Sequence, residues 1–446
     1  MFDLTTIKFY TYLSNKFGVI LQMTDIKKRN RAYWFLIISS FLLYVIMTGA
    51  KNVYTAEMSL VGKFFGVDKA TVSSTMQYYF YTYAGMQLLL VPFMKKLNIK
   101  WYLVITISIS AVITIVVGLT TQLWQITILY TVNGAFQAGI WGCLVKQFAN
   151  YLPQRLLPKA NKILTIGIAV ASALSYLCAA VFASNWKLPF FILGGILVVC
   201  IVLFFLSTNY VKKFPKEAEP THHVVHSDGT EEDVLDEAEN DFIHLTTKKR
   251  RIVFYAISLV VSLVCTALYF MGQNWMPNML QEVFGLPDNV SLYITVLAPI
   301  CITIGPVLTV NSCEKHKNFV AVGIVYFGIS CLFALLLFLF YDKNLIVTII
   351  LLLCFLITSN GARMISLSTV SMRLRTSIEP GTYTTFVNAA ASVTAGLGPF
   401  IFGSIIDASG WGTAYLTLLI ANVALVLILI GTFFLIKFAN KNKKFD

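Results

Sequence analysis

Long apolar runs separated by short polar segments fill most of this chain. Runs of about 20 apolar residues are long enough to cross a bilayer as a helix, and they recur from end to end. We predict twelve spans near residues 32–62, 73–94, 101–120, 124–148, 161–184, 187–208, 251–281, 289–311, 318–341, 344–372, 382–406 and 411–437. The pattern therefore predicts an all-α membrane protein.

A polar segment at 209–250 separates the sixth predicted span from the seventh. Its middle is acidic, and it has too few apolar residues to fold alone. We therefore predict a leader at 1–31, a six-helix half at 32–208, an acidic linker at 209–250, a second half at 251–437 and a basic tail at 438–446. This layout resembles the major facilitator fold, in which solute binds between two repeated halves near the membrane midplane.

Composition supports this class and gives an orientation. Hydrophobic residues make up 57% of the chain and charged residues only 12%, against about 25% in a soluble domain. The net charge of +13 does not indicate nucleic-acid binding, because 28 of the 34 Lys and Arg residues fall in the termini and in loops on one side. The positive-inside rule makes that side cytoplasmic. The Lys-, Asn- and Ile-rich composition is typical of a low-GC bacterium, so we expect a monomer in a bacterial plasma (inner) membrane.

Motifs for other classes are missing from the sequence. It contains no GxxxxGK[ST] phosphate loop, HExxH or GxSxG, and its five histidines lie in predicted loops, so we expect no enzyme, metal or cofactor. The eight cysteines form no CxxC pair and read as core residues. No Asp or Glu falls near a predicted midplane, which favours exchange or facilitated transport over proton symport.

Two cations inside predicted spans are the main candidate site residues. Lys51, followed by Asn52, lies within one helical turn of the middle of the first span, and Arg363 lies similarly in the tenth. Asn360 precedes Arg363 by three residues and shares its helix face. An ionisable group in the membrane indicates a functional site, although snorkelling of the side chain to an interface is the alternative.

Polar and aromatic residues of the fourth and seventh spans extend the candidate site. Gln137 and Trp141 share one face of the fourth span, where interhelical hydrogen bonding is the alternative role. Tyr269, Gln273 and Asn274 lie in the seventh span, shortly before a proline expected to kink or end the helix. Among the tyrosines of "QYYFYTY" in the second span, at most two can face a cavity.

Several stretches together resemble the organophosphate:phosphate antiporter branch of the major facilitator superfamily, the group of glycerol-3-phosphate and hexose-phosphate carriers. "AKNVYTAEM" is similar to its first-helix motif, "GAFQAGIWGCLVK" to its fourth-helix motif and "NWMPNMLQEV" to its seventh-helix motif. "GLGPFIFGSIIDASGW" resembles the general eleventh-helix pattern of the superfamily. The resemblance implies a secondary transporter that works by alternating access.

The departures from that branch concern its phosphate clamp. The two clamp arginines of the family fall here on Ala50 and Tyr269, and its fifth-helix histidine has no counterpart. A single lysine does not reproduce bidentate phosphate recognition by arginine. Lys51 and Arg363 remain available for a different anion.

These observations predict a secondary transporter of a small polar, anionic organic solute that is organophosphate-, carboxylate- or sugar-like. The alternatives are a multidrug or metabolite exporter of the same fold and a transporter-like sensor that binds ligand without moving it. We expect four basic residues to serve membrane orientation and the cytoplasmic gate, namely Lys95, Lys96, Arg155 and Arg250.

Overall fold

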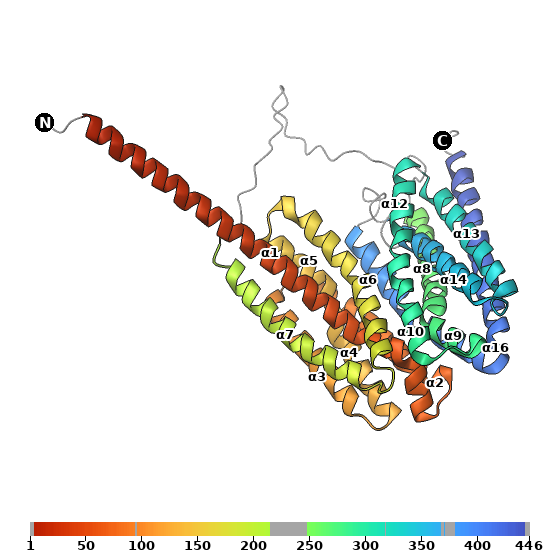
Figure 1. Cartoon of the computed structure of the whole chain (residues 1–446). Coiled ribbons are helices and arrows are strands. Elements are labelled where there is room, and N and C mark those ends of the chain that lie inside the picture. The colour runs from red at the N-terminus through yellow and green to blue at the C-terminus, as the bar shows by residue number, and fades with distance from the viewer. Residues whose placement is uncertain are drawn as a thin grey trace.

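A computed structural model describes residues 4–93, 96–214, 248–316, 318–366, 370 and 380–441, and the elements within these ranges are helical. Figure 1 shows two groups of helices side by side, the first in red to yellow and the second in green to blue. The first group contains α1 (Leu4–Phe65), α2 (Lys69–Leu90), η1 (Val91–Phe93), α3 (Ile99–Leu119), α4 (Leu123–Gln137), α5 (Ile140–Tyr151), η2 (Gln154–Leu156), α6 (Leu157–Val181) and α7 (Leu188–Val211).

The second group holds the C-terminal spans. It contains α8 (Lys248–Asn274), α9 (Met276–Phe284), α10 (Asp288–Thr295), α11 (Leu297–Ile302), α12 (Ile304–Lys315), α13 (Phe319–Phe340), α14 (Leu345–Met364) and α16 (Pro380–Lys441). Ten of the described helical stretches are long and apolar enough to cross a membrane. The longest, at 385–437, holds two spans, and the more polar α2 completes the twelve predicted spans.

Three predicted spans are broken rather than continuous. The fourth breaks between α4 and α5, where Gly139 adopts the left-handed φ of 78° that a residue with a Cβ rarely takes. The seventh breaks at Trp275, shortly before a proline in the first turn of α9. The eighth is divided into α10, α11 and α12 by breaks three residues before Pro299 and Pro306. Each proline removes a hydrogen bond to the carbonyl four residues earlier and crowds it.

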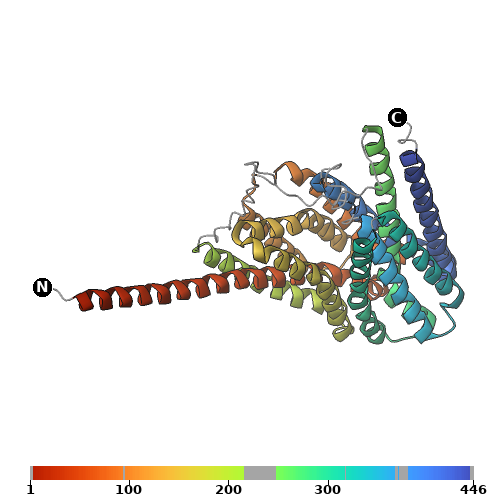
Figure 2. The ribbon, with the colours of Figure 1, turned by 90° about the horizontal axis from the view of Figure 1, so that it is seen from above.

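Both ends of the chain differ from the predicted boundaries. Residues 4–31 of the predicted leader continue as helix into the first span, and this part of α1 projects beyond the helical body in Figures 1 and 2. The eleventh and twelfth spans form α16, which turns at Gly410 with φ 77° and ψ 178°. Polar composition alone does not end a helix. A helix can therefore continue past a predicted boundary where no proline or cap ends it.

Two faces of the molecule are useful for orientation. The terminal face carries the helix ends at Val211, Lys248 and Lys441, and the distal face carries the turns at 66–68, 285–287 and 342–344. The two groups of helices lean apart toward the terminal face in Figure 1. The helix ends at Val211, Lys248 and Lys441 therefore lie at the face where the halves diverge.

The largest contacts between the halves involve two helix pairs. α2 lies against the first part of α16, and α6 lies against α10 and α11. Gly396 of α16 makes the first contact possible, since a Cβ there would lie 2.7 Å from the Cα of Gln77. Small residues at such crossings let helix backbones approach closely within a membrane.

Polar bonds join the two halves at the distal face. Lys63 of α1 donates to Asp288 of α10 at 2.6 Å, and Ser59 donates to Gln281 of α9 at 2.6 Å. The Nζ of Lys69 in α2 lies 3.0 Å from Glu282 and 3.3 Å from Asp407. The structure is therefore closed at this face.

Candidate functional site

Two adjoining cavities of about 250 and 160 Å³ lie between the halves. Helices α1, α2 and α6 of the first half and α8, α14 and α16 of the second contribute to their walls. Lys51, Arg363, Phe80 and Phe270 line both cavities. The two cations predicted from the sequence therefore meet in one space, one from each half.

Lys51 faces this space from a polar stripe on α1. Thr48 and Tyr44 precede it by three and seven residues and line the same cavities, as residues on one helix face do. Its Nζ lies 5.7 Å from the centre of the Tyr79 ring and 5.5 Å from that of Phe80. Cation–π attraction partly replaces the missing counter-charge, because no Asp or Glu is among the residues that line the two cavities.

Arg363 is held by two residues of its own half. Its Nε and Nη2 donate to Oδ1 of Asn360 at 3.2 and 2.8 Å. Asn360 is anchored in turn, since its amide donates to the carbonyl of Ile302 at 3.2 Å. The guanidinium carbon lies 4.7 Å from the centre of the Tyr269 ring. Asn360 is thus a positioning residue, and it does not itself line either cavity.

An aromatic bridge connects the two cations across the halves. The ring centres of Phe80 in α2 and Phe270 in α8 are 6.0 Å apart. Lys51 lies over the first ring, and the Arg363 guanidinium carbon lies 6.0 Å from the centre of the second. These rings form an apolar surface between two positive charges.

The other predicted residues differ in how free they are to bind a solute. Asn52 donates to Ser172 at 2.9 Å and lines the smaller cavity, as do Gln273 and Asn274. The buried Oε1 of Gln273 has no hydrogen-bond partner in the described structure. Gln137 lines the larger cavity but already accepts from Tyr79 at 2.8 Å and donates to Ser110 at 2.7 Å. Gln273 is therefore better placed than Gln137 to gain a ligand bond.

Trp141 also lines the larger cavity, and its ring packs edge-on against Tyr44 at 5.3 Å. Ala50, where the resembling family has a clamp arginine, is 1% exposed and lies in the apolar core with its carbonyl near Tyr130. Tyr269, at the other clamp position, supports Arg363 instead of carrying a charge. The cationic groups of this cavity thus come from Lys51, which follows Ala50 in the sequence, and from Arg363, which contacts Tyr269 in the fold.

Two of the predicted gate residues, Lys96 and Arg155, do not line the cavities. Arg155 donates to Asn30 at 3.3 Å within the first half, and Lys96 is exposed. Lys95 and the side chain of Arg250 lie outside the described residues. The contacts that close the distal face involve other residues, including Lys63 and Lys69. In the sequence, only the opposite charges at the outer helix ends indicate these contacts.

Sequence reasoning missed most of the aromatic lining. Tyr44, Phe80 and Phe270 line the cavities, and so do Tyr79 and Tyr83 among the four tyrosines of the second span. The stripe of Tyr44, Thr48 and Lys51 is detectable from its helical spacing. Phe80 and Phe270 are not, because an apolar residue in an apolar span carries no sign of the side that it faces.

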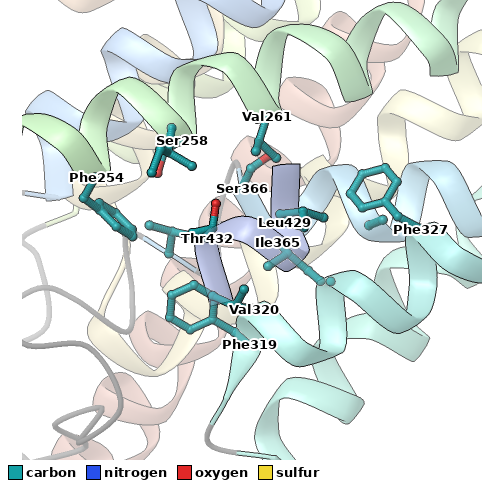
Figure 3. A pocket seen from close by; sticks show the side chains of 14 residues that line it. Phe254, Ser258, Val261, Phe319, Val320, Phe327, Ile365, Ser366, Leu429 and Thr432 are labelled. Atoms are coloured by element: carbon teal, nitrogen blue, oxygen red, sulfur yellow. The ribbon is translucent and has the colours of Figure 1, made fainter. Parts of the chain in front are cut away.

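A further cavity of about 50 Å³ lies wholly within the second half. Figure 3 shows its lining, in which Phe254, Phe319 and Phe327 surround a space with hydroxyls from Ser258, Ser366 and Thr432. It contains no charged side chain and receives no residue from the first half. A polar solute passing between the halves would not enter it.

Comparison with known proteins shows the family. The profile of the Major Facilitator Superfamily matches residues 36–379, well over half of the chain. The chain therefore belongs to the Major Facilitator Superfamily, and its fold is the twelve-helix fold of that family. A search of curated protein sequences found no significant match.

Solved structures of transporters share this fold at low sequence identity. A bacterial homolog of the human lysosomal transporter Spinster, in an inward-facing and unoccupied conformation, is 15% identical with a TM-score of 0.66, covering 91% of this chain and 97% of its own. The nucleoside transporter NupG is 15% identical, with a TM-score of 0.62 and coverages of 90% and 99%. A D-xylose-proton symporter is 12% identical, with a TM-score of 0.63 and coverages of 89% and 97%.

Proposed function

We propose that this protein is a secondary transporter that moves a small polar organic anion across a bacterial plasma membrane by alternating access. The observation that carries the proposal is the pairing of Lys51 and Arg363, one from each half, in a space whose lining contains no Asp or Glu. Two uncompensated cations attract an anion and repel a cation. An anion that contacts both halves also stabilises the conformation in which the halves close around it.

The shape and chemistry of the lining limit the class of solute that the cavities can bind. The cavities of about 250 and 160 Å³ suit a small metabolite, and Asn52, Gln273 and Asn274 offer hydrogen bonds beside the aromatic surface. An organic phosphate, a carboxylate or an acidic sugar fits this combination. Among these, the absence of the two clamp arginines of the organophosphate antiporters favours a carboxylate or an acidic sugar over the phosphate group that those carriers exchange.

We assign the terminal face to the cytoplasm, because the positive-inside rule applies to the Lys and Arg residues of the termini and of the loops at that face. The distal face, closed by Lys63, Lys69 and their carboxylate partners, is then external. The conformation described here is accordingly inward-facing.

One observation favours a second candidate, a multidrug or metabolite exporter. Eight aromatic residues line the two cavities, more than a small anion requires: Tyr44, Tyr79, Phe80, Tyr83, Trp141, Tyr176, Tyr269 and Phe270. Aromatic lining suits large apolar or cationic compounds. The two uncompensated cations count against cationic drugs.

Counterflow in proteoliposomes distinguishes these candidates. The panel would contain a hexose phosphate, a hexuronate, a dicarboxylate, a neutral nucleoside and a cationic dye. The proposal expects accelerated exchange of at least one anion and none of the dye. Dye transport that is unchanged by Lys51→Gln, with no exchange of any anion, would support the exporter instead.

A further inference from the structure

Glu57 is a buried carboxyl that the proposed anion site does not use. It lies in α1, six residues after Lys51, and its side chain is 0% exposed. Neither carboxyl oxygen has a hydrogen-bond partner in the described structure. An ionised carboxylate buried without a partner is far too costly, so the group is neutral and carries a proton in this conformation.

Glu57 lies in α1 shortly before the residues that close the distal face. Ser59 and Lys63 follow it by two and six residues, the latter about 9 Å along the helix. Both bond to the second half, Ser59 to Gln281 and Lys63 to Asp288. The adjacent Ala56 packs in a small apolar cluster that also contains Leu292 of α10. The second half therefore covers α1 at this level.

Other titratable groups around this part of α1 do not offer Glu57 a positive partner in the closed state. Asp288 of α10 acts on its carboxyl electrostatically and disfavours its negative charge. The surrounding described lysines already have partners: Lys63 bonds to Asp288, Lys69 to Glu282 and Asp407, and Lys187 to the Thr120 carbonyl. Nearby phenols on α1, α4 and α6 are those of Tyr54, Tyr130 and Tyr176, all buried.

Opening of the distal face would change each of these conditions. The halves cannot separate there without breaking the bonds of Ser59 and Lys63 to the second half. Asp288 then moves away with its half, Lys63 loses its counter-charge, and water reaches the outer part of α1. An exposed Glu carboxyl in water is ionised above about pH 4.3. Glu57 would thus lose its proton as the face opens.

We propose that Glu57 is a proton-binding site of the transport cycle, occupied when the distal face is closed and vacated when that face opens. The site rests on the proposed alternating-access function. Closing the face then takes up one proton, so the ratio of closed to open molecules falls tenfold for each unit of rising pH. Acid on that side of the membrane favours closure, and alkali favours opening.

Spin-label distances across the distal face test this site without a transported solute. Labels at Thr121→Cys and Lys343→Cys lie in exposed turns of opposite halves, in a background in which Cys301, Cys331 and Cys354 are replaced by serine. Populations of short and long distances would be measured between pH 5.5 and 7.5, where exposed Asp, Glu and Lys side chains do not titrate. The proposal expects a hundredfold fall in the closed-to-open ratio over this range.

Variants decide whether Glu57 carries this proton. Glu57→Gln keeps the shape but cannot ionise, so its closed-to-open ratio should be independent of pH, and Glu57→Asp should restore the tenfold slope. Lys63→Gln should shift the ratio toward the open state at every pH. A slope that Glu57→Gln leaves unchanged, or a wild type without a slope although Lys63→Gln opens the face, would overturn the proton site alone. A face that stays closed in every variant would overturn the alternating-access function together with the site.

Discussion

Removal of the Lys51 charge should weaken binding of the transported anion by about 30-fold. A unit anion 4 Å from Nζ gains about 1 kcal/mol in a bulk-water dielectric and about 4 kcal/mol at the effective dielectric typical near a protein surface. The Lys51 side chain is half-buried between Tyr79 and Phe80, and the cavity holds space for water, so we take an intermediate value of about 2 kcal/mol. Each 1.4 kcal/mol is a factor of ten in affinity.

The assay is binding of the anion identified by counterflow, measured by titration calorimetry on the detergent-purified protein. Lys51→Gln should show the full loss, while Lys51→Arg, which keeps the charge, should retain most of the affinity. Lys100→Gln is the matched control, because Lys100 is a buried lysine that bonds to Asn209 outside the cavities. An affinity that falls equally in Lys51→Gln and Lys100→Gln, or in neither, would refute the electrostatic role of Lys51.

Three further predictions concern the rest of the site and the fold. Asn360→Ala should weaken anion binding about tenfold, seen by calorimetry, because Arg363 loses both bonds that hold its guanidinium over the cavity. Lys69→Gln should shift the closed-to-open ratio of the distal face about fivefold toward open, as about 1 kcal/mol of partly exposed ion pairing is lost. Gly305→Ala should lower the thermal unfolding temperature markedly, because a Cβ there would overlap the Ile357 carbonyl of α14.

Matched controls accompany these predictions. Lys187→Gln should leave the distal face closed, since Lys187 bonds only to a carbonyl within its own half. Gly328→Ala should leave the unfolding temperature within a few degrees of wild type, because no atom lies within 4 Å of the added Cβ. Unfolding of Gly305→Ala at the same temperature as Gly328→Ala would contradict the close packing of α12 on α14.

The spans and the two halves were predictable because the bilayer imposes a length and a polarity on each helix. Breaks within spans were harder to predict. The break at Trp275 follows from the proline beside it, whereas that at Gly139 requires a backbone conformation that many membrane glycines do not adopt. The continuous helix through residues 4–31 was missed, because polar composition suggests a leader but does not exclude helix.

The candidate site was predictable only where a residue is unusual for its surroundings. A lysine or arginine inside an apolar span is costly, so Lys51 and Arg363 were identified and the structure places both in one space. Phe80 and Phe270 lie between them but match the apolar background, so only the packing of the halves reveals them. Glu57 lies toward the outer end of the first predicted span, and only the structure reveals its complete burial.

A double-mutant cycle on Lys51 and Arg363 tests most directly whether the two halves hold one anion together. Binding of the identified anion would be measured for wild type, Lys51→Gln, Arg363→Gln and the double variant. The account predicts that each single variant binds more weakly and that their effects are non-additive by at least about 0.5 kcal/mol, as for residues that share a partner. Strictly additive losses, or no loss in either single variant, would contradict it.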